Sequence, residues 1–256
     1  MTNGGIYTMA LMWSPGIAAI ITQLVFHKSL RGLGWKPGKI KYLAMGYILP
    51  VIYCLVVYGI TWISGLGNFP NPDFITILQT NYGFSAETGN LALAYFLPIM
   101  VTLGVLSGVL SAAGEEIGWR GFLVPELSKH MSYTKAMFLS GAIWAAWHMP
   151  LIFFADYSLP GVPVFYSAIM FTIMVMGISF AFGWLRLKSG SLWPAALFHA
   201  SHNLFIQSVF TPLTEPNEIT PYIIDEFGIG LAIMGVVVAY YFWRKRDELP
   251  VTSEPA

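Results

Sequence analysis

The sequence predicts an all-α fold, a polytopic membrane protein with about seven transmembrane helices. Three observations lead to this prediction. Hydrophobic residues make up 56% of the 256 residues and charged residues only 10%, whereas a soluble domain carries roughly 25% charged residues. The apolar residues form runs of about 20, the length that crosses the hydrocarbon core. All 13 lysine and arginine residues lie in alternate connections or at the C-terminal end, an asymmetry typical of membrane topology.

Each apolar run is predicted as one helix. The first is not a signal peptide, because no positive residues precede it and it is too long. The third ends beside a charged cluster, and a helix that begins near Tyr95 rather than Leu91 takes Glu115 into the membrane. The sixth has Pro194 in its first turn, where proline is tolerated. In order, the runs are 6–26, 42–64, 92–113, 136–155, 164–185, 191–210 and 227–243.

The connections between the runs predict the orientation. The loops 65–90, 156–163 and 211–226 contain no lysine or arginine. Because basic residues favour the cytoplasmic side, we expect the N-terminus outside and the C-terminus in the cytoplasm. The chain would form a single integral membrane domain over 1–256, in the plasma membrane if its source is bacterial or archaeal. The acidic residues of the three loops fit ordinary outer connections, and they are Asp73, Glu87, Asp156, Glu215, Glu218, Asp225 and Glu226.

Composition also limits the partners and cofactors. Zero net charge argues against a nucleic-acid partner, which needs a basic surface for phosphates. The partners expected instead are membrane lipid and a peptide or lipid-anchored protein. The single cysteine, Cys54, excludes an intramolecular disulfide and a cysteine-based metal site.

The first polar cluster, Glu115 to Arg120, lies at the end of the third run. Glu116 and Arg120 have i,i+4 spacing and can pair on one helix face. Glu115 points about 100° away and has no partner in its own helix. This division predicts one structural and one working carboxylate. An interfacial charge cluster that caps the span is the alternative.

Two further clusters place histidines inside spans, where ionisable groups are expensive and indicate function. His148 lies about 12 residues into the fourth span, or roughly 18 Å from its start. In the sixth span, His199 and Asn203 share a helix face, and His202 is one residue off it. Both histidine depths are counted from the cytoplasmic side and are comparable. Ordinary packing of neutral histidines is the alternative, and for His202 it is the preferred one.

Together these groups suit the activation of water. A carboxylate can act as general base, and imidazole and amide donors can stabilise an oxyanion. Alternatively, Glu115, His148 and His199 could hold zinc and leave one position open for water. In both arrangements water attacks an acyl carbon, which is peptide hydrolysis inside the membrane.

The three clusters resemble the motifs of the CAAX-protease and bacteriocin-processing (CPBP/Abi) family of intramembrane proteases. Residues 115–120 match EExxxR, 144–148 match FxxxH, and 199–203 match HxxxN, in that order. Trp144 stands where the motif usually has phenylalanine; both are bulky aromatics, so we expect little consequence. The motif-bearing catalytic core covers 110–205.

The resemblance implies an endopeptidase of the CAAX-processing type, with an active site that opens toward the cytoplasm. Glu115 would activate the water with help from His148, and His199 and Asn203 would stabilise the oxyanion. Family members include proteases that remove the last three residues of prenylated proteins. Both a zinc-dependent and a metal-free glutamate mechanism are compatible with the resemblance. The supporting residues would be Glu116, Arg120, Trp144 and His202.

Two other functions remain open from the sequence. A proton-coupled transporter or channel also uses glutamate and histidine inside helices, and a non-catalytic bacteriocin-immunity protein could keep the same fold. Other intramembrane proteases fit poorly. The sequence contains no HExxH and no GxSG, and its aspartates lie outside the cores of the spans.

Overall fold

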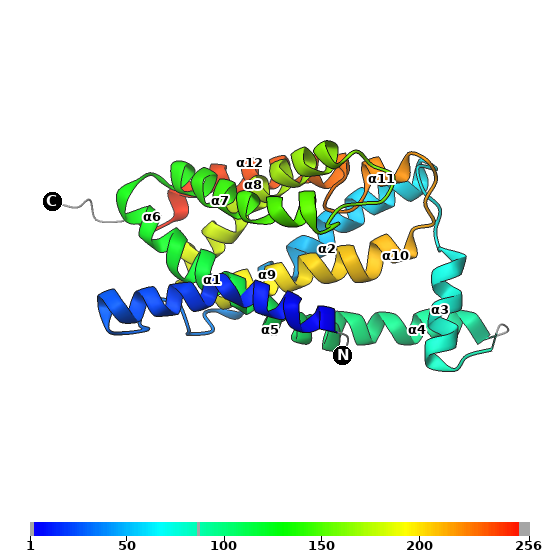
Figure 1. Cartoon of the computed structure of the whole chain (residues 1–256), viewed down its shortest axis with the longest axis horizontal. Helices are drawn as coiled ribbons and strands as arrows, with labels where there is room; N and C mark the ends of the chain where they lie inside the picture. The colour runs from blue at the N-terminus through cyan, green and yellow to red at the C-terminus, as the bar shows by residue number, and fades with distance from the viewer. Residues whose placement is uncertain (1–2, 86–87, 251–256) are drawn as a thin grey trace.

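The computed structural model describes residues 3–85 and 88–250, and these residues form helices and connections without a named strand. Long helices lie side by side along one axis (Figure 1). The helices are α1 Asn3–His27, α2 Ile40–Ile63, α3 Pro72–Tyr82, α4 Gly89–Ile99, α5 Val105–Glu116, α6 Val124–His130, α7 Tyr133–Phe154, α8 Val164–Ser189, α9 Trp193–Asn203, α10 Thr211–Leu213, α11 Thr220–Ile223 and α12 Ile229–Arg244.

The predicted fold class is confirmed. Five helices among the described residues are long and apolar enough to cross a membrane. The sixth predicted span, 191–210, corresponds to α9 and the π-helical segment Leu204–Phe210 that continues it. The seventh corresponds to α12, a shorter apolar helix. The total of seven spans and their orientation stay predictions. The five long spans are Tyr7–His27, Ile40–Ile63, Leu91–His130, Tyr133–Phe154 and Val164–Ser189.

The third span is longer than its predicted range of 92–113. Helical structure continues from Leu91 to His130, through π-helical segments at Met100–Gly104 and Ile117–Leu123. The apolar residues after Glu116 permit this continuation, and it takes the carboxylates away from the helix end. The charged cluster therefore does not cap the helix, because the helix continues past it.

Close packing of α1 against α5 sets the position of the first motif. A Cβ atom on Gly118 would lie 2.6 Å from the Cβ atom of Pro15, and one on Gly114 would lie 2.7 Å from the Trp13 ring. Only glycine lets the two helices approach this closely. Glu115 and Glu116, which follow Gly114, are both buried.

Two predicted loops contain structure that the sequence analysis missed. The 65–90 loop contains α3, which Asn71 caps by accepting a hydrogen bond from the Asp73 backbone at 3.1 Å; Pro72 starts the helix, where its missing N–H costs nothing. Glu87 lies outside the described residues. The 211–226 loop is not an ordinary outer connection, because Asp225 and Glu226 are buried.

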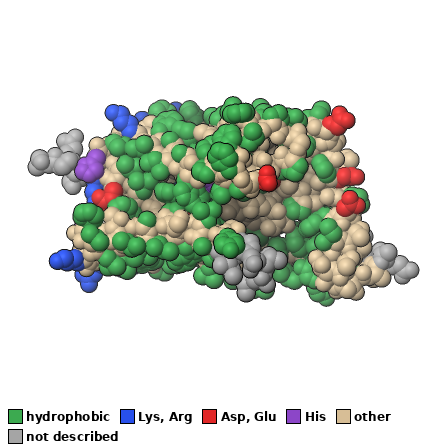
Figure 2. All heavy atoms as spheres, in the orientation of Figure 1, with side chains coloured by type: hydrophobic (Ala, Val, Ile, Leu, Met, Phe, Trp, Pro, Cys, Tyr) green, Lys and Arg blue, Asp and Glu red, His purple; other side chains and the backbone are tan. Residues whose placement is uncertain are grey.

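Charge is segregated along the bundle. On the face in Figure 2, lysine and arginine side chains gather at one end, and most acidic side chains in view lie toward the other. The sides between the two ends are apolar, and residues such as Leu106, Leu110 and Ile233 are exposed there. Such an apolar band is what a lipid-facing surface requires.

Candidate active site

A cavity of about 390 Å³ lies inside the bundle, and the four predicted catalytic side chains all line it. Glu115 comes from α5, His148 from α7, and His199 and Asn203 from α9. Trp144 and His202, two of the predicted supporting residues, also line the cavity. The structure therefore brings together three motifs that are separated by up to 88 positions in the sequence.

Glu115 is 2% exposed, and two indole groups orient its carboxylate. Its Oε2 atom accepts hydrogen bonds from Trp144 Nε1 at 2.8 Å and from Trp119 Nε1 at 3.2 Å. The prediction that Glu115 has no partner in its own helix is wrong, because Trp119 is one turn further along. We expected little consequence from tryptophan at position 144 in place of the usual phenylalanine. The hydrogen bond from Trp144 corrects that expectation, because phenylalanine has no hydrogen-bond donor in its side chain.

Glu116 lies behind the cavity in a buried ionic cluster. Its Oε1 atom is 2.8 Å from Arg120 NH1 and 2.8 Å from His199 Nδ1. The i,i+4 pair predicted from the sequence is thus formed. The Arg120 guanidinium also lies 4.0 Å from the ring centres of Trp144 and Phe182. This cluster ties the first motif to the third.

Hydrogen bonds assign the protons of two cavity histidines, His148 and His199. His148 Nδ1 lies 2.9 Å from the Trp144 carbonyl oxygen, and His199 Nδ1 lies 2.8 Å from the Glu116 carboxylate. Both oxygens are acceptors, so each Nδ1 carries a proton. In each ring Nε2 is then the nitrogen that remains for chemistry.

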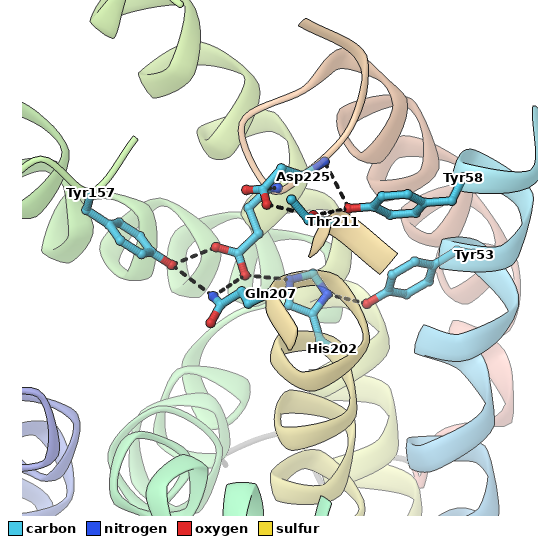
Figure 3. A network of polar contacts seen from close by, with 8 residues as sticks. Tyr53, Tyr58, Tyr157, His202, Gln207, Thr211 and Asp225 are labelled. Carbon is cyan, nitrogen blue, oxygen red and sulfur yellow. Dashed lines mark hydrogen bonds and ion pairs between the residues drawn. The ribbon is translucent and has the colours of Figure 1, made fainter. Parts of the chain in front are cut away.

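A second polar network borders the cavity, and the sequence analysis did not predict it (Figure 3). Glu226 accepts hydrogen bonds from the Tyr157 hydroxyl at 2.6 Å and from Gln207 Nε2 at 2.9 Å. His202 Nε2 lies 3.6 Å from Glu226. Gln207 lies four residues after Asn203 and so on the same helix face, a signal that was available in the sequence.

Burial changes the acid–base behaviour of the turn before α12. Loss of solvation, reinforced by the negative charge of Asp225, raises the pKa of Glu226 to about 7. Burial likewise raises the pKa of Asp225, and burial together with the neighbouring Glu226 raises that of Tyr157. These carboxyl groups therefore titrate closer to neutral pH than exposed ones do.

The cavity lining contains carboxylates and imidazoles but no lysine or arginine. Among the described residues, no three histidine, cysteine, aspartate or glutamate side chains are arranged to hold a metal ion. Glu115, His148 and His199 therefore do not fit the zinc arrangement that the sequence allowed. We derive no step through a metal.

Comparison with known proteins agrees with this site. The family model described as type II CAAX prenyl endopeptidase Rce1-like matches residues 95–205, which contain all three motifs. The chain is 30% identical over 214 residues to CAAX prenyl protease 2 of Methanococcus maripaludis; the match covers 79% of this chain and 73% of that protein. The chain therefore belongs to the CAAX-protease family of intramembrane proteases, as the motifs predicted.

Proposed function

We propose that the protein hydrolyses a peptide bond of a prenylated or otherwise lipid-anchored substrate, and that Glu115 activates the attacking water. The observation that carries this proposal is the position of Glu115. Its carboxylate is buried, faces a cavity shared with His148, His199 and Asn203, and is oriented by two indole donors. Glu116, in contrast, is neutralised by Arg120.

The geometry supports the following sequence of events. The indoles bind Oε2 of Glu115, so Oε1 accepts a proton from water as the water oxygen attacks the peptide carbonyl carbon. His148 Nε2 accepts a hydrogen bond from the same water and orients it. The carbonyl π electrons move to its oxygen and form a tetrahedral oxyanion.

The opposite wall stabilises that oxyanion. Asn203 donates an amide N–H, and His199 donates from Nε2 when it is protonated, a state that the Glu116 carboxylate favours. When the C–N bond breaks, the proton on Glu115 passes to the leaving amine. This restores the carboxylate, and one water has been added across the peptide bond.

The shape and chemistry of the cavity suit a substrate that is already in the membrane. Much of the lining is apolar, including Phe171, Met174 and Ile178. The lining also includes Tyr7 and Ala155, and the face in Figure 2 is hollowed near the middle of the molecule. The family resemblance implies a mouth at the cytoplasmic end, which is predicted to be the basic one. This position instead favours lateral access from the lipid.

Cleavage of a membrane-tethered peptide by protein in vesicles tests the proposal. We expect Glu115→Ala and His148→Ala to lower kcat by at least about a hundredfold, the usual contribution of general acid–base catalysis. Glu126→Ala is the matched control, because Glu126 pairs with Lys129 at the surface. Wild-type rates in both cavity variants would contradict the mechanism. A wild-type protein that cleaves neither prenylated nor unprenylated peptides would favour the non-catalytic alternative.

A further inference from the structure

Glu226 is a buried carboxylate that the proposed mechanism does not use. It lies in the turn between α11 and α12, is 2% exposed, and lines the same cavity as Glu115. Its polar neighbours come from distant parts of the chain (Figure 3): Tyr157 from the connection after α7, His202 from α9 and Gln207 from the π-helical continuation of α9. Glu226 is therefore placed where the walls of the cavity meet.

One carboxylate oxygen of Glu226 binds Tyr157, whose ring packs against His148 in the cavity wall. Oε2 accepts a hydrogen bond from the Tyr157 hydroxyl at 2.6 Å. The Tyr157 ring stacks on the His148 ring, with centres 6.1 Å apart and planes at 28°. The ring of Phe227, the next residue, also packs against the Tyr157 ring, with ring centres 5.2 Å apart and planes at 82°. The position of Glu226 thus determines where Tyr157 meets His148.

The other carboxylate oxygen of Glu226 contacts two residues that flank Asn203 in the sequence. Oε1 accepts a hydrogen bond from Gln207 Nε2 at 2.9 Å and lies 3.6 Å from His202 Nε2. His202 directly precedes Asn203, and Gln207 follows it by one helical turn. His202 and Gln207 therefore bracket Asn203 in the sequence, and their contacts with Glu226 connect the helix of Asn203 to the turn.

The hydrogen-bond directions agree throughout the network when Glu226 is ionised. Tyr53 Oη lies within hydrogen-bond distance of His202 Nδ1. When the hydroxyl donates, the proton of neutral His202 is on Nε2, facing Glu226. Tyr157 and Gln207 also donate to this carboxylate. The members of a buried hydrogen-bond network support one another, and the network loses rigidity when one member is changed.

We propose that Glu226 is a positioning residue for the peptidase reaction. Through Tyr157 it holds His148 in position, and through His202 and Gln207 it holds Asn203 in position. The proposal rests on the function proposed above. It assigns Glu226 no contact with the reacting atoms. Its role is to hold the base side and the oxyanion side of the cavity at a fixed separation.

The test compares Glu226→Gln with Asp225→Asn in the vesicle assay. Glutamine keeps the shape of the side chain but turns one acceptor into a donor, which opposes Gln207 or Tyr157. We expect kcat to fall about tenfold or more, with KM within about threefold of wild type. Asp225→Asn is the matched control from the same turn. Asp225 is also buried, and it accepts hydrogen bonds from the backbone N–H of Glu226 and from Thr211, which lies outside the cavity lining. Asparagine can keep the first bond through its amide oxygen and donate to Thr211 with its amide N–H, so we expect a kcat within about twofold of wild type at pH 8, where Glu226 is ionised in both proteins.

The melting temperature of the variants distinguishes a positioning role of Glu226 from a merely structural one. Glu226→Gln removes the cost of burying a charge, so the melting temperature at pH 8 should equal or exceed that of wild type while kcat is reduced. Tyr157→Phe should lower kcat as well. The double variant should lose little more than the worse single variant, because both act through one network.

The pH profile gives a second readout. Six titratable groups lie near Glu226: Asp225 in its own turn, Tyr157 after α7, His202 and His199 on α9, and Tyr53 and Cys54 on α2. Because the pKa of Glu226 is raised to about 7, wild-type kcat should rise as Glu226 ionises between about pH 6 and 8. Glu226→Gln should lack this rise and keep any contribution from the histidines.

Three results would overturn the proposal: wild-type kcat in Glu226→Gln, an equal loss in Asp225→Asn, or a loss that parallels a lower melting temperature. An unchanged pH profile in Glu226→Gln would also contradict it. Failure of the proposed function would look different, because Glu115→Ala would then retain activity. If Glu115→Ala is inactive and Glu226→Gln is fully active, only the positioning role is wrong.

Discussion

At the scale of single residues, two adjacent glutamates differ because of what surrounds them. Glu116 is bound by Arg120 and His199, whereas Glu115 accepts hydrogen bonds from two neutral indoles. The i,i+4 spacing predicted the pairing of Glu116. It could not predict the Trp144 bond to Glu115, because that contact joins two different helices 29 positions apart in the sequence.

Replacing Trp144 with phenylalanine tests the importance of that bond. Phenylalanine fills most of the same space but removes a hydrogen bond to a charged group, worth about 1.5–3 kcal/mol. If the bond orients Glu115 in the transition state, kcat in the peptide assay should fall by about tenfold to a hundredfold. Trp243→Phe on α12, outside the cavity lining, is the control and should remain fully active. Equal activity of both variants would show that the indole donor is dispensable.

At the scale of elements, the site depends on helices that do not end where the apolar runs do. The segment Ile117–Leu123 directly follows Glu116, and Leu204–Phe210 directly follows Asn203. Both are π-helical, a geometry that often occurs at functional sites. Hydropathy predicted the elements themselves, because they are long and apolar. It could not predict π-helical turns or the buried turn at Asp225 and Glu226, which depend on tertiary contacts.

The contact between α1 and the first motif can be tested with two alanine variants. In Gly118→Ala the new Cβ atom would overlap Pro15, with its backbone carbon at 2.7 Å, and overpacking costs about 1–3 kcal/mol. We expect a lower melting temperature and reduced activity. In Gly59→Ala the new atom has open space, so that variant should be as stable as wild type or up to about 1 kcal/mol more stable. The reverse order of stability would contradict the packing.

At the scale of the whole molecule, the distribution of charge predicts the topology. The three non-basic loops and the basic connections were assigned to opposite sides from the sequence alone, and Figure 2 shows the same segregation along the bundle. The fold class followed from composition and run length. The route to the cavity did not, because it depends on how α1 and the connection after α7 pack around it.

Cysteine labelling in intact cells measures this topology directly. The native Cys54 is buried, so single cysteines introduced at exposed positions can be read separately. An impermeant maleimide should label Asp73→Cys from outside, and it should label Lys129→Cys only after the membrane is opened. The reversed pattern would invert the orientation. Labelling of both cysteines from the same side would show that the predicted number of spans between them is wrong.

The central claim is that Glu115 activates water in a cavity reached from the membrane, and a single-turnover experiment tests it most directly. A fluorescent, membrane-tethered peptide is mixed with excess wild-type or Glu115→Gln protein in vesicles, and binding and cleavage are followed separately. Glutamine keeps the indole contacts possible but cannot accept the proton. We predict that Glu115→Gln binds the peptide within about threefold of wild type and cleaves it at least about a hundredfold more slowly. Cleavage by Glu115→Gln at the wild-type rate would contradict the account.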